Sequence, residues 1–337
     1  MIARYNYPLK ALNTFGIAVR AKRYIRPASI KETMDLFARE KIYKNRLIIL
    51  GGGSNILFTG DFDGTVIQPS FDRIEIVKTD QESVTITAEA GLNWDNLVSW
   101  AVEKDLGGLE NLSYIPGNVG AAPIQNIGAY GVEACELITG VHILSIENGN
   151  AGFLGRQECG FGYRDSIFKN ELKGKYIITK VEFRLHRPPH SFNLSYGNLD
   201  KIAVKNGEIT LRGIRDAVIA TRKEKLPDPA VLGNAGSFFK NPLIKKKKYA
   251  ELMSVYGDMP AWQAGSGVYK ISAAWLIEEA GWKGKSIGRA GVYDKHALIL
   301  VNLGNAEGAE ILKLSKMIIE SVQEKFDITL NAEVNII

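Results

Sequence analysis

Two glycine-rich segments of this chain have the composition of nucleotide-binding loops. The first is Gly51, Gly52, Gly53, Ser54 and Asn55. It follows a strongly apolar stretch at 46–50, which is expected to be a buried strand. Consecutive glycines let a backbone approach a ligand closely, and their N–H groups can point at a pyrophosphate. A Rossmann fingerprint would need a further glycine where Ile56 stands, so the segment is either another kind of phosphate turn or an ordinary tight turn.

The second segment, IPGNVGAAPIQNIGAYG at 115–131, combines small residues with two side-chain amides. Its glycines indicate that something planar or charged comes close to the backbone. The amides of Gln125 and Asn126 can hydrogen-bond the edge of a flavin ring. A glycine-rich crossover loop without a ligand is the alternative.

Three further segments each hold a polar side chain in an unusual setting. Arg164 lies among aromatic residues in FGYRDSIFK at 161–169. Ser237 lies between glycines and phenylalanines in GNAGSFFKNP, and Glu333 is the lone carboxylate of an apolar terminal strand. Taken singly, they are also explained as a surface cation, a turn cap and an outward-facing strand position.

Several other motifs are excluded by single residues. The GKS at 284–286 is no P-loop, because Glu279 stands where the first glycine is required, and no GxSxG is present. His186 and His190 have the spacing of a helical metal pair, but two prolines separate them. Two cysteines without a CxxC support neither a disulfide framework nor a zinc knuckle, so no metal is expected.

The elements that position these segments mix helices and strands without strict alternation, which predicts α+β domains. Ser29 and Glu32 form the start of a capping box for a helix at 29–40. Lys245 to Lys248 are interpreted as a solvated loop, with phosphate steering as the alternative. Further helices are expected at 93–104, 211–223, 271–281 and 306–325. Further strands are expected at 64–68, 73–78, 83–90, 140–146, 175–186, 297–302 and at the C-terminus.

Length and composition are those of an ordinary globular protein. The 337 residues leave room for two or three domains, and 45% hydrophobic residues argue against disorder. No apolar run approaches the roughly 20 residues of a membrane span, and the start lacks the apolar core of a signal peptide. A net charge of +5 is too mild to identify nucleic acid as a partner. We therefore expect a cytoplasmic protein that binds neither membrane nor nucleic acid.

In their order along the chain, these motifs resemble the UDP-N-acetylenolpyruvoylglucosamine reductase family, in its longer, tyrosine-loop class. The matching stretches are NTFGI at 13–17, LGGGSNIL at 50–57, IPGNVGAAPIQNIGAYGVE at 115–133, YRDSIFK at 163–169, RKEKLPDP at 222–229, GNAGSFFKNP at 233–242, ISAAWLIEEAGWKGKSIG at 271–288 and AEVNII at 332–337. The resemblance implies a two-lobed FAD-binding region of vanillyl-alcohol-oxidase type at 1–68 and 69–219. A substrate-binding domain at 220–337 would follow it.

The resemblance also implies that FAD is the cofactor and NADPH the co-substrate in the synthesis of a peptidoglycan precursor. No histidine precedes His142 and both cysteines lie outside the glycine turn, so FAD is expected to be non-covalent. The protein is expected to act as a monomer. The implied flavin contacts are Gly51, Gly52, Gly53, Ser54, Asn55, Pro116, Gly117, Gln125, Asn126 and Gly128.

Arg164, Ser237 and Glu333 are the catalytic residues that the resemblance implies. Hydride from the flavin would add to C3 of the enolpyruvyl group, leaving negative charge at C2 and its carboxylate. The guanidinium of Arg164 and a protonated or hydrogen-bonded Glu333 suit that charge. Ser237 would then protonate C2, since a carbanionic centre is basic enough to take a proton from a hydroxyl.

The substrate contacts implied by the resemblance are Tyr196, Lys225, Asn241 and Lys270. Lysines and an amide suit the diphosphate of a UDP-sugar. His296 departs from the family pattern, because many relatives have glutamine there, so no nucleotide contact is carried over to it. Two alternative functions remain: a flavin oxidase of the same fold acting on a sugar or lactone, and a non-catalytic flavin- or UDP-sugar-binding protein.

Overall fold

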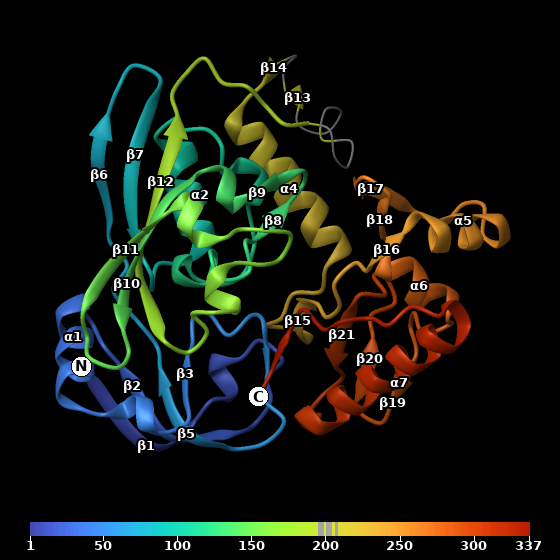
Figure 1. The fold of residues 1–337 in the computed structure, drawn as a ribbon, viewed down its shortest axis with the longest axis horizontal. Coiled ribbons are helices and arrows are strands. Elements are labelled where there is room, and N and C mark those ends of the chain that lie inside the picture. The colour runs from blue at the N-terminus through green and yellow to red at the C-terminus, as the bar shows by residue number, and fades with distance from the viewer. Residues whose placement is uncertain (195–198, 200–203, 206–207) are drawn as a thin grey trace. The chain divides into compact units, whose positions relative to one another are not determined.

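The computed structural model describes every residue except 195–198, 200–203 and 206–207. These residues form two compact units, each assembled from segments that are separate in sequence (Figure 1). Unit 1 comprises Met1–Tyr7, Ala21–Gly52 and Asp63–Lys223; unit 2 comprises Pro8–Arg20, Gly53–Phe62 and Glu224–Ile337. The three-domain division at 1–68, 69–219 and 220–337 stays a prediction. None of the described helices is both long and apolar enough to span a membrane.

A small sheet at the start of the chain is covered by the first helix, α1 (Ile30–Arg39). Ser29 caps this helix, since its side chain accepts the Glu32 N–H at 3.1 Å. In a capping box the Glu32 carboxylate would accept the N–H of Ser29 itself. Here it accepts the N–H of the preceding residue, Ala28, at 2.8 Å. The strands, in sheet order, are β1 (Ile2–Pro8), β2 (Arg20–Arg26), β5 (Phe62–Ile67) and β3 (Leu47–Ile49). The last of these is half-buried, not fully buried as predicted.

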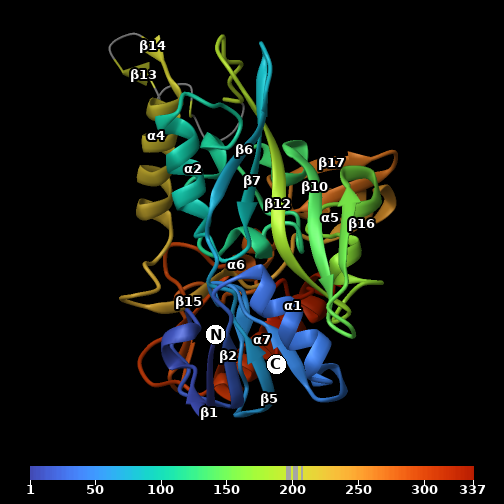
Figure 2. The same cartoon turned by 90° about the vertical axis from the view of Figure 1, so that its left-hand side faces the viewer.

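The main sheet of unit 1 is antiparallel throughout (Figure 2). Its strands, in order, are β11 (Ala151–Gly155), β10 (Ile138–Ser145), β12 (Tyr176–His186), β7 (Ser83–Glu89) and β6 (Ile74–Thr79). Strand β7 buries nearly all of its side chains, and β12 buries alternate side chains along its second half. Strand β6, at the edge of the sheet, is largely exposed. Period-2 patterning predicted four of these strands correctly, and only β11 was not expected.

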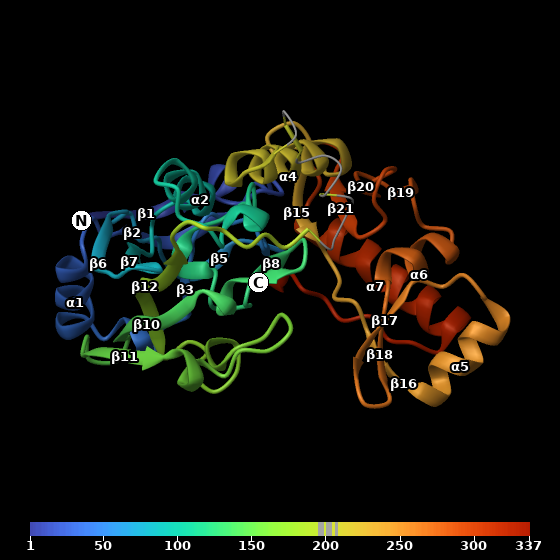
Figure 3. The same cartoon turned by 90° about the horizontal axis from the view of Figure 1, so that it is seen from above.

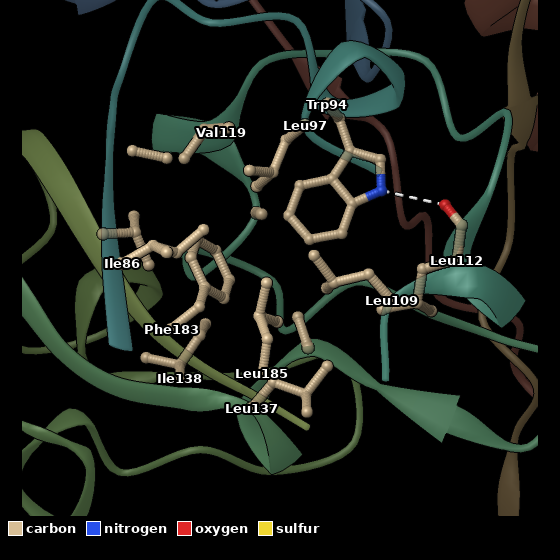
Figure 4. Close-up of a cluster of buried hydrophobic side chains, with 14 of the residues drawn as sticks. Ile86, Trp94, Leu97, Leu109, Leu112, Val119, Leu137, Ile138, Phe183 and Leu185 are labelled. Carbon is tan, nitrogen blue, oxygen red and sulfur yellow. Dashed lines mark hydrogen bonds between the residues drawn. The ribbon is translucent and has the colours of Figure 1, made fainter. Parts of the chain in front are cut away.

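The core of unit 1 forms where α2 (Trp94–Glu103) packs against this sheet (Figure 4). Trp94 is almost fully buried and meets Phe183 of β12 edge-on, with ring centroids 6.0 Å apart. Its indole N–H donates to the carbonyl of Leu112 at 2.8 Å. A buried indole needs such a partner, and here the partner lies three residues before the glycine-rich segment at 115–131. The core therefore fixes where that segment begins.

Unit 2 contains a four-stranded sheet packed against α7 (Gly308–Phe326), which also contacts α6 (Ala273–Glu279) (Figure 3). Leu276, Ile311, Leu314 and Ile318 of these helices are fully buried. The strands, in order, are β15 (Gly233–Ser237), β21 (Ile299–Asn302), β20 (Ala290–Val292) and β19 (Ser286–Ile287). The helices predicted at 271–281 and 306–325 are thus present, with slightly shifted bounds.

A second, smaller sheet of unit 2 carries α5 (Lys246–Val255), which the sequence analysis did not predict. Its strands, in order, are β16 (Leu243–Lys245), β18 (Val268–Ile271) and β17 (Ala261–Gly265). The lysine run is therefore not a loop: Lys246 to Lys248 begin α5, and Lys248 pairs with Asp327 at 3.1 Å. Four successive cations without a Ser, Thr, Asp or Asn cap gave no recognisable helix start.

The remaining elements are short, apart from the long helix α4 (Leu211–Lys225). The strands are β4 (Ile56–Leu57), β8 (Gly128–Ala129), β9 (Val132–Glu133), β13 (Val204–Lys205), β14 (Glu208–Ile209) and β22 (Asn335–Ile336). The 3-10 helices are η1 (Lys10–Leu12), η2 (Ile42–Lys44), η3 (Glu110–Leu112), η4 (Val119–Ala121), η5 (Ala134–Glu136), η6 (Arg156–Cys159) and η7 (Ile167–Lys169).

Candidate active site

The two glycine-rich segments are in contact within unit 1. A side chain at Gly52 would place its Cβ 2.9 Å from the Cα of Gly117 and 3.0 Å from Oδ1 of Asn118. The Gln68 amide donates to the Gly51 carbonyl at 2.9 Å and holds the turn. Gly53 has φ +65, and a Cβ there would lie 1.9 Å from the Leu12 carbonyl oxygen. Packing between protein segments, not the approach of a ligand, therefore explains Gly52 and Gly53.

Four backbone N–H groups of these segments donate to no acceptor among the residues that the structure describes. They belong to Gly51, Gly52, Gly117 and Asn118. Gly52 is exposed and the other three are half-buried, so water or a ligand must accept these hydrogens. Neighbouring N–H groups of this kind form anion sites, which fits the pyrophosphate of a dinucleotide. The sequence analysis missed Asn118, whose only signal was its place in the Pro-Gly-Asn turn.

Asn126 differs from the flavin contact that was expected of it. It is fully buried, and its φ is +44. Its amide donates to Glu133 at 2.7 Å and to the Gly162 carbonyl at 3.1 Å, while its Oδ1 accepts the Cys135 N–H at 3.0 Å. With donor and acceptor both used inside the protein, this side chain positions the loop.

Arg164 lies beside the second glycine-rich segment. Its guanidinium donates to the Gly128 carbonyl at 2.8 Å and lies 5.6 Å from the centre of the Tyr163 ring. Its backbone is left-handed, with φ +53, which costs about 1 kcal/mol for a non-glycine residue. Buried Ser166, which the sequence analysis did not single out, donates to the Ile124 carbonyl at 2.6 Å. These contacts anchor the 161–169 loop to the 124–128 segment and hold Arg164 in a conformation it would not otherwise prefer.

Ser237 is the last residue of β15 in unit 2 and is half-buried. The strand is irregular between Asn234 and Ser237, where Gly236 adopts φ +68. The Gly236 N–H donates to the side chain of Asn234, not to that of Ser237. Within the described part of the chain, the Ser237 hydroxyl has no hydrogen-bond partner. Ser237 therefore does not act as a turn cap, and its hydroxyl is available to a ligand.

Glu333 lies next to the Ser237 segment in unit 2. Its N–H donates to the Phe238 carbonyl at 2.8 Å, and Ala332 forms a bridge with Phe239. Its side chain is half-buried. The apolar surroundings expected from the sequence are only partly present, since Val334 is buried but Ile336 is 42% exposed. The terminal strand is also shorter than predicted, because β22 pairs over two residues only, in parallel with β4.

Three of the four expected substrate residues lie in unit 2. Asn241 accepts the N–H of Ala273 at 2.9 Å, at the start of α6. Lys270 belongs to β18, and its ammonium group lies 5.7 Å from the centre of the Trp262 ring. Asn241 and Lys270 are neighbours, because Ile271, which follows Lys270, donates its N–H to the carbonyl of Pro242, which follows Asn241. Lys225 is exposed at the end of α4, and Tyr196 lies outside the described residues.

His296 occupies the same region of unit 2 as Lys225. Burial lowers its pKa, and the positive charges of Lys225 and Lys283 lower it further. Its Nδ1 accepts the N–H of Leu298 at 3.3 Å, so the neutral ring carries its hydrogen on Nε2. A neutral imidazole with one N–H donor and one acceptor resembles the amide of glutamine in hydrogen-bonding capacity.

Two protein-family profiles match the chain. One describes the C-terminal domain of UDP-N-acetylenolpyruvoylglucosamine reductase and matches residues 228–337; the other describes an FAD binding domain and matches residues 21–151. The predicted α+β fold, with an FAD-binding region ahead of a C-terminal domain, is confirmed by these matches.

Full-length relatives extend the match to nearly the whole chain. The UDP-N-acetylenolpyruvoylglucosamine reductase of Flavobacterium johnsoniae is 45% identical over 334 residues, 98% of each chain. That of Bacteroides fragilis is 43% identical over 98% of this chain and 99% of its own length. The crystal structure of the Thermus caldophilus reductase superposes with a TM-score of 0.67 at 25% identity, covering 99% of this chain and 98% of that one. The chain therefore belongs to the UDP-N-acetylenolpyruvoylglucosamine reductase family.

Proposed function

We propose that this chain reduces UDP-N-acetylglucosamine enolpyruvate to UDP-N-acetylmuramate with NADPH, in the cytoplasmic synthesis of peptidoglycan precursors. The names of its full-length relatives and the match to an FAD binding domain support this activity. Bound FAD would carry hydride from NADPH to C3 of the enolpyruvyl group. The protein is expected to act as a monomer.

The residues available for FAD fit its pyrophosphate. Gly51, Gly52, Gly117 and Asn118 offer N–H groups that no described residue accepts, in two segments that touch. Such groups hold a phosphate without adding a side-chain charge. Asn126 would act indirectly, by fixing the loop from which Gln125 and Gly128 reach the cofactor.

Ser237 carries the proposal for the chemical step. Ser237 is half-buried and its hydroxyl makes no hydrogen bond to the described residues, which leaves both its proton and its lone pairs for a substrate. We assign it the transfer of its Oγ proton to C2 of the enolpyruvyl group. A structural serine of a turn would instead donate to or accept from a nearby backbone group.

Arg164 and Glu333 would stabilise the charge that precedes this proton transfer. The guanidinium of Arg164 is held against the Gly128 carbonyl, so that its charge needs no reorganisation when negative charge develops on the substrate. The Glu333 backbone is fixed beside Phe238, adjacent to Ser237. In this proposal its carboxyl group lies within reach of the same C2 centre.

Lys225, Asn241 and Lys270 would bind the UDP part of the substrate. Two cations and one amide suit a diphosphate and a uracil ring. The hydrogen bond from the Ala273 N–H, at the start of α6, fixes the orientation of the Asn241 amide. The amide oxygen accepts this hydrogen bond, and the NH₂ group therefore faces away from Ala273. His296 would add one neutral donor beside Lys225.

An absorption spectrum of the purified protein, followed by two assays, tests this function. The protein should be yellow and should release intact FAD on heating or in acid. NADPH oxidation should then depend on the enolpyruvyl sugar. Rapid reoxidation of the flavin by oxygen, with no response to that sugar, would instead support an oxidase of the same fold. Bound flavin without turnover of either kind would support a binding protein.

A further inference from the structure

We propose that Thr14 is a positioning residue for Ser237, acting through the backbone of Asn234. This inference rests on the proposed function, because it concerns the proton transfer that is assigned to Ser237. Thr14 belongs to the NTFGI stretch at 13–17, which contains none of the residues expected to contact FAD or the substrate. All three residues lie in unit 2.

Thr14 supplies hydrogen-bond partners to β15, the strand that ends at Ser237. β15 is an edge strand of its sheet, so the backbone groups on its open side need partners from elsewhere. The Thr14 carbonyl accepts the Asn234 N–H at 3.0 Å, and the Thr14 hydroxyl donates to the Asn234 carbonyl at 2.6 Å. The second bond comes from a side chain, so a residue without a hydroxyl at position 14 cannot form it.

The opposite side of Thr14 is anchored to the first glycine-rich segment. The Thr14 N–H donates to the Gly53 carbonyl at 3.0 Å. The Thr14 hydroxyl lies 3.3 Å from the same oxygen, but its single hydrogen goes to the closer carbonyl of Asn234. Buried Asn13 closes the loop around Thr14, because its side chain bonds both the carbonyl and the N–H of Ile17, at 3.0 and 2.9 Å. Thr14 therefore fixes Asn234 to a turn that is itself held in place.

Asn234 in turn determines where Ser237 points. β15 pairs with β21 at Asn234–Val301 and again at Ser237–Ile299, so two residues of β15 stand opposite one residue of β21. Such a bulge re-aims the side chain that follows it. The Asn234 side chain holds this bulge, since its Oδ1 accepts the Gly236 N–H at 2.9 Å. A displacement of Asn234 therefore moves Gly236 and Ser237 with it.

The position of the Ser237 hydroxyl depends on this backbone. The hydroxyl makes no hydrogen bond within the part of the chain that the structure describes, so no side-chain contact would correct a displaced strand. Proton transfer requires the donor at hydrogen-bond distance from the accepting atom. A misplacement of about 1 Å can slow such a step about 100-fold.

The test compares T14V, which has the shape of threonine without the hydroxyl, with T14S, which keeps the hydroxyl. The matched control is T33V: buried Thr33 of α1 also donates its hydroxyl to a backbone carbonyl, that of Ser29 at 3.0 Å, but it lies in unit 1. T14A, which also removes the hydroxyl, gives the same comparison should T14V not fold. Stopped-flow absorbance of the flavin measures reduction by NADPH and reoxidation by the enolpyruvyl sugar, for each variant alone and combined with S237A.

For T14V we expect reoxidation by the sugar to slow about 10- to 100-fold, while reduction by NADPH stays within a few-fold of the wild type. T14S should recover most of the lost rate, and T33V should match the wild type in both halves. In the S237A background, T14V should slow reoxidation by less than about twofold more, because a residue that acts through Ser237 then has nothing left to position.

Reoxidation of T14V within about twofold of the wild-type rate, with S237A slow, would overturn this inference and leave the proposed function intact. Equal slowing of both halves in T14V, or an undiminished effect of T14V in the S237A background, would mean that Thr14 only supports the fold. If S237A is not slowed, the role proposed for Ser237 fails, and the role of Thr14 fails with it.

Discussion

The N–H of Glu333 donates to the carbonyl of Phe238 at 2.8 Å, which places the C-terminal segment beside the strand that ends at Ser237. Two residues that the family resemblance links to one reaction are thereby brought next to each other within unit 2. The contact uses only backbone atoms, so it occupies neither the Ser237 hydroxyl nor the Glu333 carboxyl group.

Replacing Ser237 by alanine should separate the two halves of the reaction. Reduction of FAD by NADPH does not involve C2 and should stay within a few-fold of the wild-type rate. Reoxidation of the flavin by the enolpyruvyl sugar should slow by about 10²- to 10⁴-fold, the usual contribution of a positioned general acid. S237C should recover part of that rate, because a thiol can also donate a proton.

Stopped-flow absorbance of the flavin measures both halves. Ser266, exposed in the hairpin between β17 and β18, provides the control S266A, which should change neither half. Equal slowing of both halves in S237A, or no slowing at all, would remove Ser237 from the mechanism.

Replacing Lys225 by alanine should raise the KM for the UDP-sugar with little effect on kcat. The expected rise corresponds to about 1.5–3 kcal/mol, the value of a hydrogen bond to a charged group. Steady-state kinetics with saturating NADPH measures it. The control is K247A, an exposed lysine of α5, and an unchanged KM in K225A would mean that this residue does not contact the substrate.

Gly52 and Gly51 should differ in their tolerance of a methyl group. G52A places Cβ 2.9 Å from the backbone of Gly117, so the two glycine-rich segments must separate; G51A meets nothing closer than 3.5 Å. We expect G52A to destabilise the protein by about 1–3 kcal/mol and to weaken FAD binding, with G51A folding normally. Urea unfolding of the FAD-free proteins checks the first effect. Equal stability of the two variants would show that the contact between the segments is not tight in solution.

The Asp95–Arg215 ion pair should make the protein sensitive to acid. Burial by itself raises the pKa of Asp95, but the hydrogen bonds from Arg215 and from the Tyr114 N–H outweigh it and lower the pKa overall. A lowered carboxyl pKa stabilises the fold above the unfolded value of about 4, and this stabilisation is lost as pH falls through the folded value. D95N should therefore cost about 2–3 kcal/mol at pH 7, and less at pH 3.

Urea unfolding at several pH values, with D216N of the exposed Arg212–Asp216 pair as control, measures this difference. The control should lose about 0.5 kcal/mol or less. A loss in D95N that is independent of pH would contradict the assignment of a lowered pKa.

His296 should destabilise the fold below about pH 6.5. Its pKa is lowered in the folded state, so on acidification the unfolded chain takes up a proton that the folded chain refuses. Replacing it with glutamine removes this effect. The free energy of unfolding of H296Q, relative to the wild type, should therefore rise between pH 8 and pH 5. A constant difference across that range would indicate an ordinary imidazole pKa.

Local patterns in the sequence were sufficient for most of the secondary structure. The Ser29 cap, the period-2 strands of the main sheet and the long apolar stripe of α7 each depend on residues close together in the chain, so propensity and periodicity predict them. The order of the motifs was likewise enough to identify the family. It also named Arg164, Ser237 and Glu333, whose roles stay predictions.

The tertiary structure decided what the local pattern could not contain. The sequence suggests that Asn126 contacts a ligand, yet its amide donates to Glu133 and to the carbonyl of Gly162. Gly162 lies far along the chain, so no local pattern could reveal this contact. The left-handed backbone of Arg164 is held by contacts with the 124–128 segment. The free hydroxyl of Ser237 depends on the geometry of an irregular strand. Contacts between distant residues fix burial, backbone strain and hydrogen-bond availability, and these quantities leave no periodic trace in the sequence.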